Sequence, residues 1–403
     1  MEPPRNINAL VKANFFAQMA DQLSLTAIPL VAVLYLELGA AGVGLLNTFQ
    51  TLPYFILSIP LGVLVDRMSK KGLMLTTETV RVFALLGILA LIHFEAITLW
   101  NLAILSFLAA LGSVGFNAAL PAYVPILVKK SQLILYNGRL ELVRSISLAL
   151  GPALAGALAS WFGASNAFVL SLILTGLTMG FVANVTRNGK VVNPDLNTPL
   201  LRDISNGAAF ILRNDKLATI MLVAFVWNCG WFVLQAAFMP LAIKTWGLSA
   251  EVVGYALGCM GLGLLVGSFF SRRIIQLLGF GPSLAFGPVV SCLASIFILV
   301  NVQFGTAILP ALAFLLFGFG PVIWVITSNT LRQLITPDHM IGCVSAMYMT
   351  ANWGARPFGA LIGASLGLYY GEIVCLIAST ILFIAQMLLV FVMRLTVTEG
   401  PSG

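Results

Sequence analysis

Charged residues are scarce in this chain of 403 residues. They make up 9% of the sequence, hydrophobic residues make up 60%, and the mean hydropathy is +1.01. Soluble domains carry about 25% charged residues, and no soluble core could cover this much apolar surface. The composition therefore excludes a soluble domain and indicates a protein that crosses a membrane several times.

The groups that catalytic and metal sites need are also few. The two histidines, His93 and His339, fall at the ends of apolar stretches, and the five cysteines have no metal-type spacing. The phosphate-binding pattern GxxxxGK[ST] is missing, and the basic residues are scattered over loops. We therefore expect no enzyme activity, no metal, no bound cofactor and no nucleic-acid partner. The expected surroundings are membrane lipids, and the expected state is a monomer.

Twelve apolar stretches are long enough to cross a bilayer as helices, which takes about 20 residues each. A barrel would show alternating segments of about ten residues instead, so we predict an all-α membrane protein. Pro121 and Pro125 are expected to break the last turns of the fourth span. The predicted spans are 13–37, 43–65, 73–94, 98–127, 138–161, 165–185, 217–241, 250–270, 281–302, 305–330, 341–368 and 372–394.

A polar stretch near the middle divides the chain into three predicted parts. These are an N-terminal six-helix bundle (1–186), a cytoplasmic linker with an interfacial helix (187–216) and a C-terminal six-helix bundle (217–403). The two halves resemble a repeat when they are aligned at an offset of 205 residues. At this offset Pro152 aligns with Pro357, and the basic loop after span two aligns with the one after span eight. We therefore expect a duplicated six-helix unit.

Basic residues set the predicted orientation. Apart from Lys244 and Arg356, every lysine and arginine lies in, or within the first turns beside, the loops on the side that both termini share. The positive-inside rule makes that side cytoplasmic. The expected location is the bacterial inner (cell) membrane, with several spans and both termini in the cytoplasm.

Asp21 is an acid about eight residues inside the first span. A charge near the bilayer centre costs at least about 2.5–3.5 kcal/mol, so a partner, a wet cavity or protonation must offset it. Burial favours the protonated carboxyl group, as proton coupling requires. Asp21 is therefore a candidate proton-coupling residue, and Gln18 and Gln22, on adjoining helical positions, are candidate substrate contacts. The alternative is an acid that packs two helices together.

Arg356 lies about fifteen residues inside the eleventh span, with Asn352 one turn away on the same face. Because arginine stays protonated, Arg356 must face a cavity, an acid or an anionic ligand. Pairing with Asp21, capture of an acidic substrate, and a static pair that locks two helices all stay open. Arg356 and Asn352 are both candidate substrate contacts.

Aromatic and amide side chains in the seventh and tenth spans suit a bulky amphipathic ligand. For each of them, packing inside the bundle is an equally open alternative. The candidates are Trp227, Asn228, Trp231, Gln235, Trp324 and Asn329.

Two acid–base pairs at i,i+3 spacing are predicted near the cytoplasmic face. Glu78 pairs with Arg81 in the third span, and Glu141 with Arg144 in the fifth. They are either snorkelling pairs that brace helix ends or an inner gate whose pairs break when the cavity opens inward.

The loop LGVLVDRMSKK after the second span follows the pattern G-x-L-x-D-R-x-x-K-K. Its acid can face the positive end of a neighbouring helix, and its basic cluster prefers the cytoplasmic leaflet. This is the loop signature of the major facilitator superfamily, which the chain resembles. The matching gate candidates are Gly62, Asp66, Arg67, Lys70 and Lys71; the loop of the second half, GSFFSRR, has Ser271 in place of the acid.

Other stretches resemble the macrolide-efflux and enterobactin-exporter branch of drug:proton antiporters within that superfamily. They are Ala20-Asp21, LPYFILSIPLGVLVDR, FNAALPAYVP, GPALAG and ITPDHMIGCVSAMY. Gly151 and Pro152 resemble part of the antiporter Gly-Pro motif, which favours export over uptake. Cys343 stands where members commonly have arginine, and Arg356 stands where a small or neutral residue is expected.

The resemblance implies two pseudo-symmetric six-helix halves that work by alternating access. The predicted function is proton-coupled export of a small amphipathic, acidic molecule, either a siderophore-type metabolite or an antibiotic of the kind that multidrug exporters carry. One alternative is a proton-coupled importer of a nutrient. The other is a non-transporting sensor, which would show no substrate flux and would tolerate Asp21→Asn.

Overall fold

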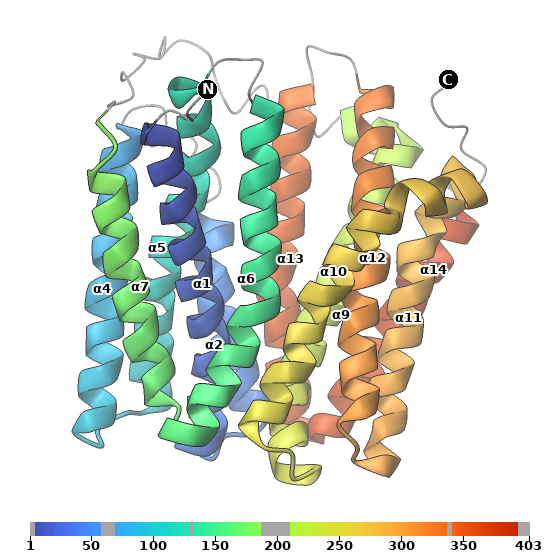
Figure 1. Cartoon of the computed structure of the whole chain (residues 1–403). Coiled ribbons are helices and arrows are strands. Elements are labelled where there is room, and N and C mark those ends of the chain that lie inside the picture. The colour runs from blue at the N-terminus through green and yellow to red at the C-terminus, as the bar shows by residue number, and fades with distance from the viewer. Residues whose placement is uncertain (1–4, 58–68, 129–132, 187–209, 337–340, 394–403) are drawn as a thin grey trace. The chain divides into compact units, whose positions relative to one another are not determined.

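A computed structural model of the chain describes residues 5–57, 69–128, 133–186, 210–336 and 341–393. These residues form twelve α-helices and one short π-helical segment (Figure 1). The first six are α1 (Arg5–Leu34), α2 (Ala40–Ile56), α4 (Lys70–His93), α5 (Leu99–Leu127), α6 (Leu133–Phe162) and α7 (Ser165–Ala183). The others are α9 (Asp215–Pro240), η2 (Leu241–Thr245), α10 (Ala250–Leu278), α11 (Phe280–Phe304), α12 (Ile308–Ile335), α13 (Ile341–Tyr370) and α14 (Glu372–Val392).

Each predicted span corresponds to one α-helix, and the all-α membrane fold is confirmed. Ten of the helices are long and apolar enough to cross a membrane. Two helices of the described part are not among them: α13 and α2. The structure describes 17 residues of α2. The chain is therefore a multi-pass membrane protein.

The expected break near the end of the fourth span is wrong. Helix α5 continues through Pro121 and Pro125 to Leu127. Transmembrane helices tolerate proline because neighbouring helices and local adjustments satisfy the freed backbone carbonyls. The helix begins at a capping box, in which Thr98 and Asn101 each accept a hydrogen bond from the other's backbone N–H.

The chain divides into two compact units. The first comprises residues 1–38, 45–195 and 249–258, and the second comprises residues 39–44, 196–248 and 259–403. The first is built mainly from α1 to α7 and the second mainly from α9 to α14. The boundaries at 186 and 217 and the interfacial helix stay predictions, because residues 187–209 lie outside the described residues.

The first unit packs α1 against α5, α6 and α7, and α4 against α5 and α7 (Figure 1). Its apolar core gathers side chains such as Ile7, Leu73 and Phe116, which are at most 1% exposed. Polar contacts add to this packing where α1 meets α7: the Ser24 and Ser171 hydroxyls lie 2.8 Å apart, and the Ser171 hydroxyl donates to the Ala20 carbonyl at 2.9 Å. The helices that carry Asp21 and its neighbours are therefore fixed by close packing.

The second unit packs α9 against α13 and α14, and α11 against α12 and α14. Gly359 permits the α9–α13 approach, because a Cβ atom there would lie 2.6 Å from the Cys229 carbonyl oxygen. Trp231 lies edge-on to Phe314 and Phe317, with ring centroids 5.9 and 5.2 Å away. Aromatic rings thus fill the interior of this unit.

Candidate functional site

A cluster of three charged side chains lies inside the first unit. Asp21 is in the middle of α1, and Glu78 and Arg81 are on α4. Arg81 Nη2 donates to Asp21 Oδ1 at 3.0 Å, and Arg81 Nη1 lies 3.4 Å from both carboxylate oxygens of Glu78. One guanidinium group therefore joins two carboxyl groups from two helices.

All three groups are withdrawn from the surface. Glu78 is 0% exposed and Arg81 is 2% exposed, while the Asp21 side chain retains 13%. The interpretation of Glu78 and Arg81 as a snorkelling pair is therefore wrong, because both side chains point into the bundle. Asp21 pairs with Arg81, since the fold brings α4 near α1. The predicted alternative, a pair with Arg356, would join the two units and stays untested.

A serine on α5 completes the cluster. The Ser113 hydroxyl accepts a hydrogen bond from Arg81 Nη2 and donates one to Asp21 Oδ1. A separate polar contact lies beside the cluster: Gln18 Nε2 donates to Asn117 Oδ1 at 2.8 Å, and both residues line a hollow with Asp21 and Arg81. Gln18 is thus a neighbour of the cluster, whereas Gln22 packs against α6 at Gly151, so closely that a Cβ atom on the glycine would overlap the Gln22 Cβ.

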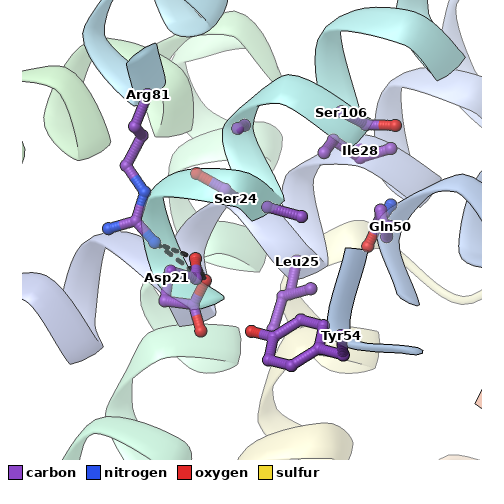
Figure 2. Close-up of a pocket in the computed structure, with 11 residues that line it drawn as sticks. Asp21, Ser24, Leu25, Ile28, Gln50, Tyr54, Arg81 and Ser106 are labelled. Carbon is purple, nitrogen blue, oxygen red and sulfur yellow. Dashed lines mark hydrogen bonds and ion pairs between the residues drawn. The ribbon is translucent and has the colours of Figure 1, made fainter. Parts of the chain in front are cut away.

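A small pocket opens beside Asp21 and Arg81 (Figure 2). Its volume of about 20 Å³ is room for about one water molecule. Figure 2 shows Gln50 and Tyr54 of α2 across the pocket from Arg81. Gln50 is 3% exposed, and its Nε2 has no hydrogen-bond partner among the described residues.

The pocket residues of α2 and α5 were not among the sequence-based candidates. Gln50 and Tyr54 are one helical turn apart, and Ser106 and Ser113 are two turns apart, so each pair shares a helix face. That spacing of polar residues inside apolar spans was the available signal.

The candidates of the seventh span are packed inside the second unit. Trp227 stacks on Trp231 with centroids 5.6 Å apart, and its Nε1 donates to the Ser291 hydroxyl at 3.0 Å. Asn228 donates to Asn352 Oδ1 and, at 2.9 Å, to the Ala224 carbonyl. The structure therefore joins Asn228 with Asn352, and their role in substrate binding stays a prediction.

The remaining substrate candidates differ in burial. Trp324 is 7% exposed, whereas Gln235, Asn329 and Arg356 are partly buried. Arg356 lies inside α13, close to Pro357. Their contacts with a substrate stay predictions.

The structure describes only some of the gate candidates. Gly62, Asp66 and Arg67 lie outside the described residues, as does the side chain of Glu141, and Arg144 is exposed. Lys71 has a clear local role: its Nζ donates to the carbonyls of Ala183 and Val185 at 2.6 and 2.9 Å, at the end of α7. Lys70 is 5% exposed and begins α4, and Pro152 lies within α6.

Comparison with known proteins identifies the family. The family model of the Major Facilitator Superfamily matches residues 10–360. Macrolide efflux protein A of Enterococcus faecalis is 26% identical over 249 residues, which cover 59% of this chain and 76% of the relative. Enterobactin exporter EntS of Citrobacter koseri is 24% identical over 334 residues, which cover 81% of this chain and 76% of the relative.

Solved structures share the fold. A mutant of the nucleoside transporter NupG aligns with a TM-score of 0.79 at 12% identity, over 96% of this chain and 99% of that one. A bacterial homologue of the iron transporter ferroportin, in an inward-facing state, aligns with a TM-score of 0.69 at 15% identity, over 95% and 98%. Because the family model matches residues 10–360, the chain belongs to the Major Facilitator Superfamily and is a transporter.

Proposed function

We propose that this transporter exports bulky amphipathic molecules in exchange for protons, with Asp21 as the coupling group. The observation that carries the proposal is the buried cluster of Asp21, Arg81 and Glu78 beside a pocket of water size. Apolar residues of similar volume often replace a buried ion pair without loss of stability. Ionisable groups kept inside a membrane therefore point to a function.

The geometry supports a switch at Asp21. When Asp21 is ionised, it accepts hydrogen bonds from Arg81 and Ser113, which ties α1 to α4 and α5. A proton on Asp21 removes the charge that attracts Arg81, so the tie weakens. Proton binding thus favours one arrangement of these helices over another, as coupled transport by alternating access requires.

The substrate class is proposed from the relatives and from Arg356. The relatives are named for macrolide efflux and for enterobactin export, and both names describe export. An arginine in the middle of α13 favours an acidic group on the substrate. We propose a siderophore-type metabolite or an acidic antibiotic, with further contacts from the predicted aromatic and amide residues.

The proposed setting is the bacterial inner membrane, with both termini in the cytoplasm and a monomer as the working unit. The predicted loop from Gly62 to Lys71 and the predicted pairs would serve as the inner gate, and Gly151 and Pro152 would let α6 bend. The support is the distribution of basic residues and the Pro152 position inside α6.

Flux into proteoliposomes under an imposed pH gradient tests the proposal, with macrolides and siderophores as substrates. Wild-type protein should accumulate substrate against its gradient. Asp21→Asn should still exchange substrate but lose the gradient-driven accumulation, while Asp215→Asn, at the exposed start of α9, should behave as wild type. Accumulation by Asp21→Asn at the wild-type level would contradict the coupling role.

The same assay tests Arg356. Arg356→Ala should lose flux of acidic substrates and keep that of neutral ones, because only the acidic group needs the guanidinium charge. Arg272→Ala, at an exposed position of α10, is the control. Equal loss for both substrate classes would contradict an anion site at Arg356.

A further inference from the structure

We propose that Glu78 holds a proton in the resting protein, that this proton leaves through Asp21, and that Arg81 then moves its pairing from Asp21 to Glu78. The exchange step rests on the proposed function, whereas the resting position of the proton follows from the cluster alone. The charge count, the hydrogen bonds, the packing and the pocket each support one part of this sequence.

Within the first unit, the charge count requires one proton. Arg81 stays cationic, so two ionised carboxylates would give the cluster one excess negative charge in the middle of the membrane helices. In the described part of the first unit, Lys12 lies over the Phe181 ring at 5.7 Å and Lys71 binds the end of α7, so both lysines have other partners. The other titratable or charged groups on α1, α2, α4 and α5 in the described part are Arg5, Tyr54, Lys70, His93 and Tyr123, and α7 has none there. Helix α6, which also packs against α1, carries Tyr136, Arg139, Glu141 and Arg144, and Arg139 lies over the Tyr136 ring at 5.2 Å.

The hydrogen bonds assign that proton to Glu78. Asp21 Oδ1 accepts from both Arg81, at 3.0 Å, and Ser113, as an ionised carboxylate does. Both Arg81–Glu78 distances are 3.4 Å and thus longer than the 3.0 Å from Arg81 to Asp21, and hydrogen bonds to an ionised acceptor are the shorter ones. Glu78 is also fully buried, whereas Asp21 retains 13% exposure. The neutral carboxyl group is therefore Glu78.

Packing fixes the aliphatic stem of Arg81, so its guanidinium group is the part that can change partner. Gly112 of α5 lies so close to α4 that a Cβ atom there would be 2.7 Å from the Arg81 Cβ. The stem of Arg81 is thus fixed, while its guanidinium already reaches both carboxyl groups. Both carboxyl groups contact the same guanidinium, so in the proposed step, in which the proton passes from the Glu78 carboxyl group to the Asp21 carboxylate, Glu78 becomes the ion that Arg81 pairs with. The total charge of the cluster does not change in this step.

The pocket gives the proton its exit. It is lined by Asp21 and Arg81 but not by Glu78, and it has room for about one water molecule. Gln50 Nε2 is a buried donor without a partner in the described part of the chain, as expected where a water molecule accepts its hydrogen bond. Neutral Asp21 would release its proton to that water.

Infrared spectroscopy of purified protein tests the resting position without any substrate. At neutral pH, the spectrum of wild-type protein minus that of Glu78→Gln should show one carbonyl-stretch band of a protonated carboxyl group. The band should move when the protein contains carboxyl-¹³C glutamate and stay in place with carboxyl-¹³C aspartate. Absence of the band, or a shift with labelled aspartate, would overturn the assignment. If Glu78→Gln does not fold, wild type titrated to high pH supplies the reference spectrum.

The change of partner has its own readout. Asp21→Asn should lack the same band, because Glu78 must then ionise to pair with Arg81. A band that persists in Asp21→Asn would overturn the proposal that Arg81 changes its partner from Asp21 to Glu78. In liposomes, Glu78→Gln should exchange substrate but lose accumulation driven by a pH gradient, and wild-type accumulation by this variant would overturn the exit step. Failure of the proposed function is distinct, since wild type itself would then show no such accumulation while the band remained.

Discussion

Arg81 donates hydrogen bonds to both carboxyl groups of the buried cluster, so its removal should be the costliest single change there. Arg81→Met would leave an uncompensated buried acid, at a cost of about 3–5 kcal/mol in the free energy of unfolding. A second substitution, Asp21→Asn, should recover part of that loss. Thermal unfolding of the purified variants in detergent measures both effects. A double variant no more stable than Arg81→Met would contradict the pairing.

At the scale of residues, the sequence allowed the chemistry to be predicted better than the contacts. Asp21 stood out because an acid is rare inside an apolar span. Its partner could not be identified, because Arg81 is 60 residues away along the chain and the pair forms only when the fold brings α4 near α1. Glu78 and Arg81 were interpreted as a local pair because i,i+3 spacing is visible in sequence, whereas burial is not.

At the scale of elements, the close approach of α5 to α4 holds the cluster together. Gly112→Ala would place a methyl group against the Arg81 stem, and overpacking of this kind costs about 1–3 kcal/mol. We expect lower thermal stability and weaker pH-driven flux. Gly176→Ala on α7 is the matched control, since a Cβ atom there meets nothing within 4 Å. Equal effects of the two substitutions would contradict a specific role of this contact.

The end of α7 offers a second prediction at this scale. Lys71 donates to the Ala183 carbonyl at the end of α7 and to the Val185 carbonyl just beyond it, so Lys71→Met should lower stability by about 1 kcal/mol through the lost hydrogen bonds. Arg273→Met, at an exposed position of α10, should change stability little. If Lys71→Met instead alters transport while thermal unfolding stays unchanged, the gate role predicted from the loop pattern gains support over this capping role.

Helices were the most predictable elements, because runs of apolar residues of spanning length leave few other folds. Their interruptions were less predictable. Pro121 and Pro125 are typical helix breakers, yet α5 includes both. The outcome depends on what surrounds the freed carbonyl groups, which is a property of the packed bundle and not of α5 alone.

At the scale of the whole molecule, the distribution of basic residues predicts the topology. In a variant without cysteine, Ala96→Cys, in the exposed α4–α5 loop, should react with a membrane-impermeant maleimide added to intact cells. Lys216→Cys, near the start of α9, should react only after permeabilisation, because both termini and this loop are expected in the cytoplasm. The reverse pattern would invert the predicted orientation.

Proton-coupled export predicts that a substrate gradient alone moves protons across the membrane. Proteoliposomes that contain a pH-sensitive dye and start without a pH gradient would receive a substrate gradient. Wild-type protein should move protons opposite to the substrate, and Asp21→Asn should move substrate without protons. Substrate flow without any proton movement in the wild type, or with protons in the same direction, would contradict the account.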